Sequence, residues 1–312
     1  MRELKVLLAK RMMGAGVGLL LDRSFGEPPL AVHPVALFGK AMTRAEMLLW
    51  RGTKPSGINY GIVGIAFATI ASRLFSSPFL GTALATYLAV AERSLLENAA
   101  GVRSSLERGD LVAARIQLPS LVGRDPESLD SFGAARAVVE SVAENSSDAV
   151  IAPMVYGALF GGSGAAIYRA INTMDAMVAH KSPQYREFGW FCARLDDLAN
   201  CVPSRLAALL SWSVPNGTWP AFSSINRDAS RHPSPNAGVV EATYAHKLGV
   251  KLGGENIYEG KKEFRPEMGG NRAASASDIG SASDLCRRSN SLFAALLIFG
   301  GVLLMFGSKG NE

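Results

Sequence analysis

Charged residues are scarce in this chain of 312 residues. Asp, Glu, Lys and Arg make up 19% of the sequence, and hydrophobic residues make up 48%. Soluble globular domains carry about a quarter charged residues. The mean hydropathy is also positive, at +0.15. This deficit of charge favours a membrane protein over a soluble one.

Cysteine is almost absent as well. The chain has Cys192, Cys201 and Cys286, an odd number without a CxxC pair or the spacing of a metal site. This excludes a disulfide framework and indicates free thiols in or near a reducing compartment.

The sequence also lacks runs of Lys and Arg, although its net charge is +5 and its pI is about 9.2. Nucleic-acid-binding domains gather basic residues on one face or stripe. Here the basic residues are scattered, so no nucleic-acid partner is expected. They fit the cytoplasmic loops of a membrane protein, where Lys and Arg accumulate.

Alternation of apolar and polar residues is rare, and no internal repeat is visible. We therefore predict an all-α, polytopic integral membrane protein, with polar helices and loops forming the active site. Residues 1–312 are expected to form a single membrane-embedded domain. Asn226–Gly270 is interpreted as rich in loops, and Ala273–Asp284 as a mobile linker.

Long apolar windows supply the candidate membrane spans, which need roughly 20 residues each. The window at 289–308 is uncharged and flanked by cations, and it predicts a transmembrane helix. The windows 55–72 and 74–91 predict a helical hairpin, either through the membrane or in a buried core. The window 149–168 contains Pro and a Gly-rich break, which predicts a broken helix. Residues 1–22 are interpreted as a retained first helix or anchor.

A first group of acids lies at Glu140, Glu144 and Asp148. In a helix this spacing places three carboxylates on one face, where neighbours repel by roughly a few tenths of a kcal/mol. A metal ion, an ammonium group or arginines would offset that repulsion. The alternative is a solvated acidic face, but an apolar run follows directly, which favours a functional role.

Two further groups combine Asp with Asn. Asn172 and Asp175 share a helix face, as do Asp196 or Asp197 with Asn200. These are oxygen ligands suited to Mg²⁺, and paired acids beside apolar sequence are costly without a partner. An Asn-Thr pair is also an ordinary helix start.

Other polar residues are open to two interpretations. His232–Gly238 predicts a rigid loop that presents Ser234 and Asn236, or a structural turn. The residues between the two Asp-containing groups either bind phosphate or lie on the surface: Lys181, Tyr185 and Arg186.

Together, these segments resemble the adenosylcobinamide-phosphate synthase family. The matching segments follow in order over most of the chain: 21–35, 122–125, 139–153, 168–190, 193–206, 232–238 and 248–260. The family usually has Ser and Gly-Tyr where this chain has Ala176 and Ala179-His180. These departures leave the acids intact and bear on substrate detail.

The resemblance implies a multi-pass enzyme of the inner membrane whose active site faces the cytoplasm. It implies ligation of adenosylcobyric acid with 1-amino-2-propanol phosphate or ethanolamine phosphate, using ATP and Mg²⁺, to give adenosylcobinamide phosphate. The expected partners are the corrinoid and amino-alcohol phosphate substrates and the lipid bilayer. Other membrane enzymes of late cobalamin assembly are candidate partners.

The resemblance also gives the polar residues expected roles. The catalytic candidates are Glu140, Glu144, Asp148, Asp175 and Asp197. The Mg²⁺ ligands are drawn from Asp148, Asp175, Asp196 and Asp197. The substrate- and phosphate-binding candidates are Asn145, Asn172, Thr173, Lys181, Tyr185, Arg194, Asn200, Arg205, Ser234 and Asn236.

Two other functions remain open at this point. An intramembrane transferase that uses a Mg²⁺-diphosphate would fit the pattern of Asp196, Asp197 and Asn200, but leaves segments 232–238 and 248–260 without a role. A non-catalytic membrane transport subunit would use buried acids as an ion path.

Overall fold

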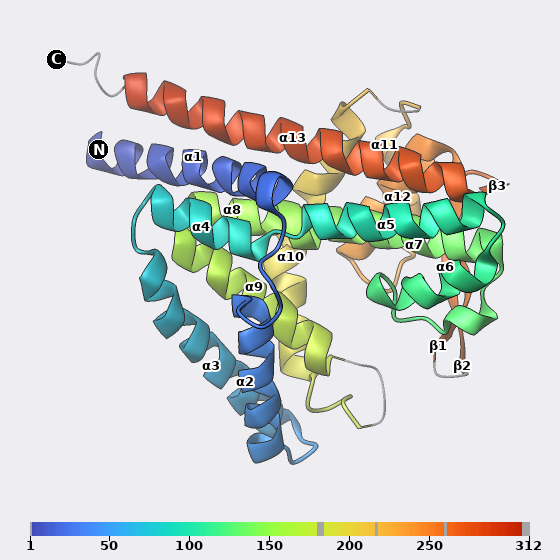
Figure 1. Ribbon diagram of the computed structural model, residues 1–312, viewed down its shortest axis with the longest axis horizontal. Coiled ribbons are helices and arrows are strands. Elements are labelled where there is room, and N and C mark those ends of the chain that lie inside the picture. The colour runs from blue at the N-terminus through green and yellow to red at the C-terminus, as the bar shows by residue number, and fades with distance from the viewer. Residues whose placement is uncertain (1, 180–183, 216–217, 259–260, 308–312) are drawn as a thin grey trace. The chain divides into compact units, whose positions relative to one another are not determined.

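The computed structural model describes residues 2–179, 184–215, 218–258 and 261–307. Helices dominate these residues (Figure 1), as the sequence predicts. The chain divides into two compact units where the sequence analysis expects a single domain. Unit 1 comprises residues 1–91, 148–203 and 293–312, and unit 2 comprises 92–147 and 204–292.

Unit 1 is built from helices. Its elements are α1 (Arg2–Phe25), α2 (Pro34–Leu49), α3 (Lys54–Ala71), η1 (Ser72–Phe75), α4 (Leu80–Ala89), α8 (Ala152–Phe160), α9 (Gly162–Val178), the first part of α10 (Trp190–Ser213) and the last part of α13 (Ala276–Gly307). Helix α1 packs against α4 and α8, and α9 packs against α3, α4 and α8. Helix α9 therefore lies at the centre of this unit.

The apolar core of unit 1 gathers around α9. Tyr60, Tyr168, Met174 and Phe188 are fully buried in one cluster that also includes Met42. Full burial of side chains of this size contributes about 1.5–3 kcal/mol each. This core fixes the face of α9 that carries the polar residues described below.

The broken helix predicted at 149–168 is confirmed. The chain is π-helical at Ser147–Ile151, α8 follows, and Gly161 separates α8 from α9. Gly161 has φ +76° and ψ −162°, a conformation that is essentially confined to glycine. Pro153 lies in the first turn of α8, where the missing N–H costs little.

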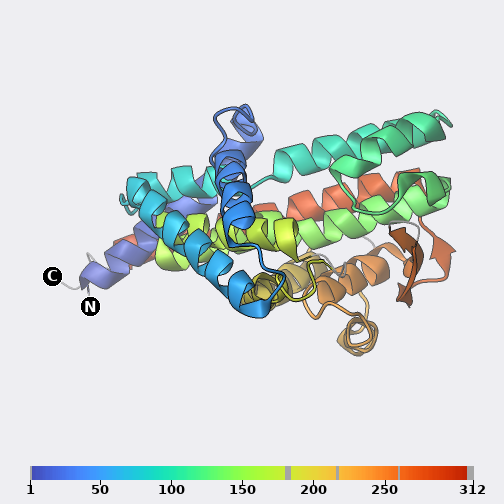
Figure 2. The same cartoon turned by 90° about the horizontal axis from the view of Figure 1, so that it is seen from below.

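Unit 2 contains helices and a small sheet. Its elements are α5 (Glu92–Glu107), α6 (Leu111–Gln117), η2 (Leu118–Ser120), η3 (Pro126–Ser128), α7 (Ser131–Ser146), the last part of α10, α11 (Phe222–Ala229), α12 (Ala237–Leu248), β1 (Val250–Tyr258), β2 (Lys261–Gly269), β3 (Arg272–Ala273) and the first part of α13. Strands β1 and β2 pair antiparallel and contact α12 (Figure 2), while β3 pairs parallel to β1.

The prediction of an all-α fold is therefore wrong in unit 2. The hairpin carries a register shift between Leu252 and Gly254, and both Gly253 and Gly254 have positive φ. This irregularity interrupts the alternation of side chains that identifies a strand in a sequence. The segment 226–270 is accordingly more ordered than the loop-rich interpretation, since it contains half of α11, all of α12 and both long strands.

The linker predicted at Ala273–Asp284 is also wrong for most of its length. Ala276–Asp284 form the first turns of α13. Asp278 caps this helix by accepting hydrogen bonds from the backbone N–H and the hydroxyl of Ser275, at 2.8 and 2.7 Å. Its small residues thus begin a long helix.

Two helices in the described part of the chain are long and apolar enough to cross a membrane. They are Lys54–Phe75, which joins α3 to η1, and Ala276–Gly307, which is α13. The first contains the predicted arm 55–72, and the second contains the predicted span up to residue 307. The prediction that the other arm, 74–91, spans the membrane is wrong, because its helix α4 has 10 residues, which is about 15 Å of helix. A multi-pass topology stays a prediction.

The conformation of Gly161 leads to a first prediction. Gly161→Ala should lower the free energy of unfolding by about 1–3 kcal/mol, because alanine is strained at this φ and its Cβ would lie 3.1 Å from Arg11 Nε. The measurement is the thermal midpoint of the detergent-purified protein. Gly123→Ala is the control, since nothing lies within 4 Å of the added Cβ. Equal midpoints for both variants would contradict a strained helix break.

Candidate functional site

A polar cluster joins α9 to α10 inside unit 1. Asn200 Nδ2 donates to Asp196 Oδ2 at 2.9 Å within α10, and Asn172 Nδ2 on α9 lies 3.4 Å from Asp196 Oδ1. Each carboxylate oxygen of Asp196 thus faces one carboxamide. The structure brings together one member of each of the two predicted Asp–Asn groups.

Tyr168 contacts this cluster through Asn200. Its buried hydroxyl lies 2.7 Å from Asn200 Oδ1 and 3.0 Å from the carbonyl oxygen of Asp148. A hydroxyl has one proton to donate, so the two acceptors compete for it. The tyrosine ring stacks on Tyr156 with centroids 5.0 Å apart. Asn200 is therefore held at both ends, with its amide nitrogen directed at Asp196.

Burial sets the electrostatics of the cluster. It raises the pKa of Asp196 above its ordinary value, and the charge of Asp197 acts in the same direction, although Asn200 and Asn172 donate to the carboxylate. Burial, together with Asp175 and Asp196, raises the pKa of Cys192 to about 12. Asp175 therefore exerts its charge on the same part of α10 as Asp196.

The remaining predicted acids of unit 1 are, like Asp196, neither fully buried nor fully exposed. The Asp197 carboxylate lies 3.6 Å from Arg194 one turn earlier in α10, with 37% and 68% of these side chains exposed. Asp148 lies in the π-helical stretch, where α-helical spacing has ended. Asp148 and Glu144 fall on opposite sides of the boundary between the units.

The other predicted binding residues of unit 1 have structural contacts. Thr173 Oγ1 donates to the carbonyl of Arg169 at 2.7 Å. Tyr185 donates to Glu46 at 2.6 Å and packs its ring against Trp50. Lys181 lies outside the described residues. The binding roles of all three stay predictions.

A second group of polar residues lies in unit 2, around Glu140. This buried carboxylate pairs with the buried guanidinium of Arg124 and accepts a hydrogen bond of 2.7 Å from the N–H of Gly253. Gly253 has φ +82°, and an added Cβ would lie 2.3 Å from Pro266 O. One oxygen of Glu140 therefore joins α7 to β1, and the other joins α7 to Arg124 in the segment that precedes α7.

Arg136, one turn before Glu140 on α7, adds to this junction. Its guanidinium donates to the carbonyls of Gly253 and Glu255 and to Asn256 Oδ1, the last two at 2.8 and 3.1 Å. The irregular part of β1 is thus held by α7. The predicted catalytic role of Glu140 stays a prediction beside this structural one.

Glu241 on α12 is a further buried acid in unit 2. Neither of its oxygens has a hydrogen-bond partner in the described residues, and His232 Nε2 lies 3.7 Å from its Oε2. Burial and the charges of Glu140 and Glu144 raise its pKa well above the ordinary value. Glu144 itself is exposed, while Asn145 donates to Ser141 O at 2.9 Å.

The predicted loop at 232–238 forms a capped turn at the start of α12. The backbone N–H of Ser234 donates to His232 Nδ1 at 3.1 Å, and Ala237 N–H donates to Ser234 Oγ at 3.2 Å. Asn236 Oδ1 accepts from Arg205 and Ser204 on α10, at 3.0 and 3.2 Å. The structure therefore brings Asn236 and Arg205 together, and their binding roles stay predictions.

No three His, Cys, Asp or Glu side chains among the described residues lie close enough to form a metal site by themselves. Mg²⁺ is commonly held by one or two carboxylates plus substrate phosphates. The predicted Mg²⁺ ligands therefore stay a prediction, and they require the substrate to complete the coordination.

Comparison with known proteins identifies the family. The family model described as CobD/Cbib protein matches residues 15–286. The chain belongs to the CobD/Cbib family. This confirms the family predicted from the ordered segments, all of which fall within the match.

Curated relatives match over most of their length. "Cobalamin biosynthesis protein CobD" of Mycobacterium tuberculosis (strain ATCC 25618 / H37Rv) is 41% identical over 292 residues, covering 89% of this chain and 91% of the relative. The protein of the same name from Stutzerimonas stutzeri (strain A1501) is 39% identical, covering 91% and 96%. That of Clostridium perfringens (strain 13 / Type A) is 36% identical, covering 81% and 86%. No solved structure matches the chain.

Within this CobD/Cbib chain, sequence reasoning missed several residues that organise the clusters. They are Arg124, Arg136, Tyr168, Arg169 and Glu241. Tyr168 lies at the end of an apolar window and resembles a core aromatic. Arg124 and Glu241 lie far from their partners in the sequence. The spacing of the acids indicated that a metal ion, an ammonium group or arginines would offset their charge, but not that Arg124 would pair with Glu140.

The raised pKa of Asp196 leads to a second prediction. An acid with a raised folded-state pKa destabilises the fold as pH rises from its unfolded pKa through its folded pKa. Asp196→Asn should therefore raise the thermal midpoint relative to wild type at neutral pH. The difference should vanish in acid, where Asp196 of the wild type is protonated in both the folded and the unfolded state. Thermal unfolding across a pH series measures this.

Glu127→Gln provides the control, because 81% of that side chain is exposed, and its midpoint should follow wild type at every pH. A destabilised Asp196→Asn variant at neutral pH would show that the carboxylate is stabilised more by its carboxamide partners than it is penalised by burial.

A third prediction concerns the buried pair in unit 2. Glu140→Ala should lower the free energy of unfolding by about 3–5 kcal/mol, because it leaves the buried Arg124 charge without its carboxylate. Arg124→Leu with Glu140→Leu should recover much of that loss, since the double variant buries no charge. Denaturant unfolding of the three proteins measures both effects. Wild-type stability in Glu140→Ala would refute the structural role assigned to this carboxylate.

Proposed function

We propose that this protein catalyses an amide ligation in cobalamin biosynthesis. It joins adenosylcobyric acid to 1-amino-2-propanol phosphate or ethanolamine phosphate, consumes ATP and yields adenosylcobinamide phosphate. The observation that carries the proposal is the Asp196–Asn172–Asn200 cluster. It places a largely buried carboxylate between carboxamides from two of the segments that characterise the family.

The reaction must first activate a carboxylate, which is a poor acyl donor. Phosphorylation by ATP gives an acyl phosphate, the amine then displaces phosphate, and one proton leaves the nitrogen. These steps require charge neutralisation on the phosphates and an acceptor for the proton. The site must also hold the amine in line with the acyl carbon.

The carboxylate of the α9–α10 cluster fits Mg²⁺, since carboxylate oxygens are ligands that this hard cation prefers. Asp196 would hold the ion, and Asp148 and Asp175 are the further candidates. The amide nitrogens of Asn172 and Asn200 face Asp196, so these two residues would keep its carboxylate in place. When bound, Mg²⁺ supplies charge neutralisation at the phosphates of ATP. Because the described residues offer no group of three metal-binding side chains, the phosphates would have to complete the coordination.

Asp197 has a different role in this proposal. It follows Asp196 directly, yet its carboxylate is more than a third exposed and pairs with the exposed Arg194 at 3.6 Å. It is the acid that a soluble substrate can reach, so we assign it the proton of the attacking amine. Arg194 would then face phosphate, a role that Lys181 and Arg205 share.

The membrane setting of the reaction follows from the helices. Lys54–Phe75 and α13 are long and apolar enough to span a bilayer. We place the protein in the cell membrane as a multi-pass enzyme, with its acidic clusters open to the cytoplasm, because ATP and the corrinoid are cytosolic.

The test is a product assay on the detergent-purified full chain with adenosylcobyric acid, aminopropanol phosphate, ATP and Mg²⁺. We expect adenosylcobinamide phosphate by mass spectrometry, and its loss when either ATP or Mg²⁺ is omitted. Folded protein that forms no product with either amino-alcohol phosphate would contradict the proposal. Product from a prenyl diphosphate instead would favour a transferase.

A fourth prediction concerns Asp197 as the proposed acceptor of the amine proton. Asp197→Asn should reduce kcat by at least about a hundredfold, the scale of general acid–base catalysis, while leaving the thermal midpoint unchanged. Glu97→Gln is the matched control, because Glu97 is also an exposed helical acid paired with an arginine on its own helix, Arg93 at 2.8 Å. Wild-type kcat in Asp197→Asn would remove this carboxylate from the mechanism.

A further inference from the structure

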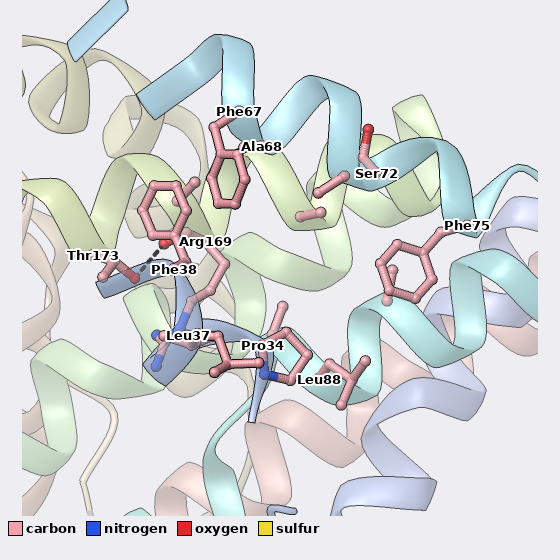
Figure 3. A pocket seen from close by; sticks show the side chains of 16 residues that line it. Pro34, Leu37, Phe38, Phe67, Ala68, Ser72, Phe75, Leu88, Arg169 and Thr173 are labelled. Carbon is pink, nitrogen blue, oxygen red and sulfur yellow. Dashed lines mark hydrogen bonds between the residues drawn. The ribbon is translucent and has the colours of Figure 1, made fainter. Parts of the chain in front are cut away.

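An apolar cavity of about 230 Å³ lies inside unit 1, beside the α9–α10 cluster. It is enclosed by α2, α3, η1, α4 and α9, and Figure 3 shows its lining. Phe38 and Phe67 stack in its wall with centroids 5.9 Å apart. Arg169 and Thr173 lie at one side of the cavity, and Phe75 lies at the opposite side (Figure 3).

Almost all of the polar lining atoms are already engaged. Ser72 Oγ donates to Thr69 O at 2.8 Å, and Thr173 Oγ1 donates to Arg169 O at 2.7 Å. The cavity therefore offers an incoming molecule apolar side chains along most of its surface. Its one charged lining residue is Arg169.

The guanidinium of Arg169 can donate a further hydrogen bond. Its Nη1 reaches Asn172 Oδ1 at 3.3 Å, whereas its buried Nε has no hydrogen-bond partner in the described residues. A buried N–H without an acceptor costs about 1–3 kcal/mol. An anionic oxygen at the cavity end would satisfy Nε and interact with the positive charge.

The substrates of the proposed reaction do not suit this cavity. Pockets for drug-sized molecules measure about 300–1,000 Å³, so the smaller space here does not admit a corrinoid. An amino-alcohol phosphate would fit by size, but its ammonium and hydroxyl groups would meet an apolar wall without partners, which is unfavourable. The occupant must combine an anionic group with an apolar body.

The position of the cavity wall indicates that such a molecule would come from the membrane. Phe67, Ala71 and Phe75 belong to Lys54–Phe75, one of the two candidate membrane spans. Ala71 is exposed and lines the cavity. We propose that this cavity binds an anionic phospholipid, with part of an acyl chain between α2, α3 and α4 and the phosphate at Arg169.

This site is inferred independently of the proposed ligation, and it would place a lipid phosphate next to Asn172. Through the hydrogen bond between Arg169 and Asn172, the lipid would help to hold the α9 side of the polar cluster. The protein would then depend on anionic lipid for the order of that cluster.

The test is native mass spectrometry of the full chain after delipidation in detergent, with phosphatidylglycerol and phosphatidylcholine of identical acyl chains. We expect about a fivefold preference for phosphatidylglycerol, equivalent to the roughly 1 kcal/mol that one basic residue gains from an anionic lipid. Arg169→Gln should abolish the preference while retaining weak binding of both lipids. Ala71→Phe, which fills the cavity from its exposed side, should reduce the retention of both.

Arg44→Gln is the matched control, because Arg44 is an exposed arginine on α2, outside the cavity lining. It should retain the wild-type preference, and thermal midpoints identify any variant that fails to fold. Equal retention of the two lipids by the wild type, or an unchanged preference in folded Arg169→Gln, would overturn the proposal. Because no catalytic turnover is measured, inactivity in the ligation assay does not affect this result.

Discussion

The hydrogen bonds around Asp196 and Asn200 are the interactions on which the account of this protein depends. An ionisable side chain between apolar helices is tolerated only where partners replace the water that it has lost. Asn172 and Asn200 supply those partners to Asp196 from two helices, and Tyr168 in turn bonds the oxygen of Asn200. Their geometry leaves the Asp196 carboxylate held on both oxygens but still partly exposed, which is the condition for a ligand that must also meet a substrate.

The irregular backbone of unit 1 serves the same cluster. The π-helical stretch at Ser147–Ile151 presents the Asp148 carbonyl to Tyr168, and the break at Gly161 sets the start of α9. Single π-turns within helices occur frequently at functional sites. In unit 2, the buried Arg124–Glu140 pair has a comparable organising role, because it ties the glycine-containing strand to α7.

Helices and acidic groups could be predicted from the sequence because their signals are local. Apolar windows and i, i+4 spacing identified most of the helical segments, the break near Gly161 and the acids of α9 and α10. The contact between Asn172 and Asp196 joins two helices, and no local spacing contains it. The β1–β2 hairpin was missed because Gly253 and Gly254 shift its register.

The residues that surround the buried charged groups also could not be predicted from the sequence. Tyr168 and Glu241 have no local pattern that distinguishes them from core or surface residues. The role of Tyr168 depends on its distant partner Asn200, and the raised pKa of Glu241 depends on its burial. The spacing of Glu140, Glu144 and Asp148 predicted one acidic face. The helix changes from α to π before Asp148, so this arrangement could not be anticipated from spacing alone.

The central claim is that the protein activates a corrinoid carboxylate with ATP before amide formation. The most direct measurement uses adenosylcobyric acid labelled with ¹⁸O in the reacting carboxylate and follows the label by mass spectrometry during turnover. The account predicts transfer of one ¹⁸O to inorganic phosphate for each amide formed, since the acyl phosphate loses that oxygen with its leaving group. Label that enters AMP, or that never leaves the corrinoid while amide accumulates, would contradict it.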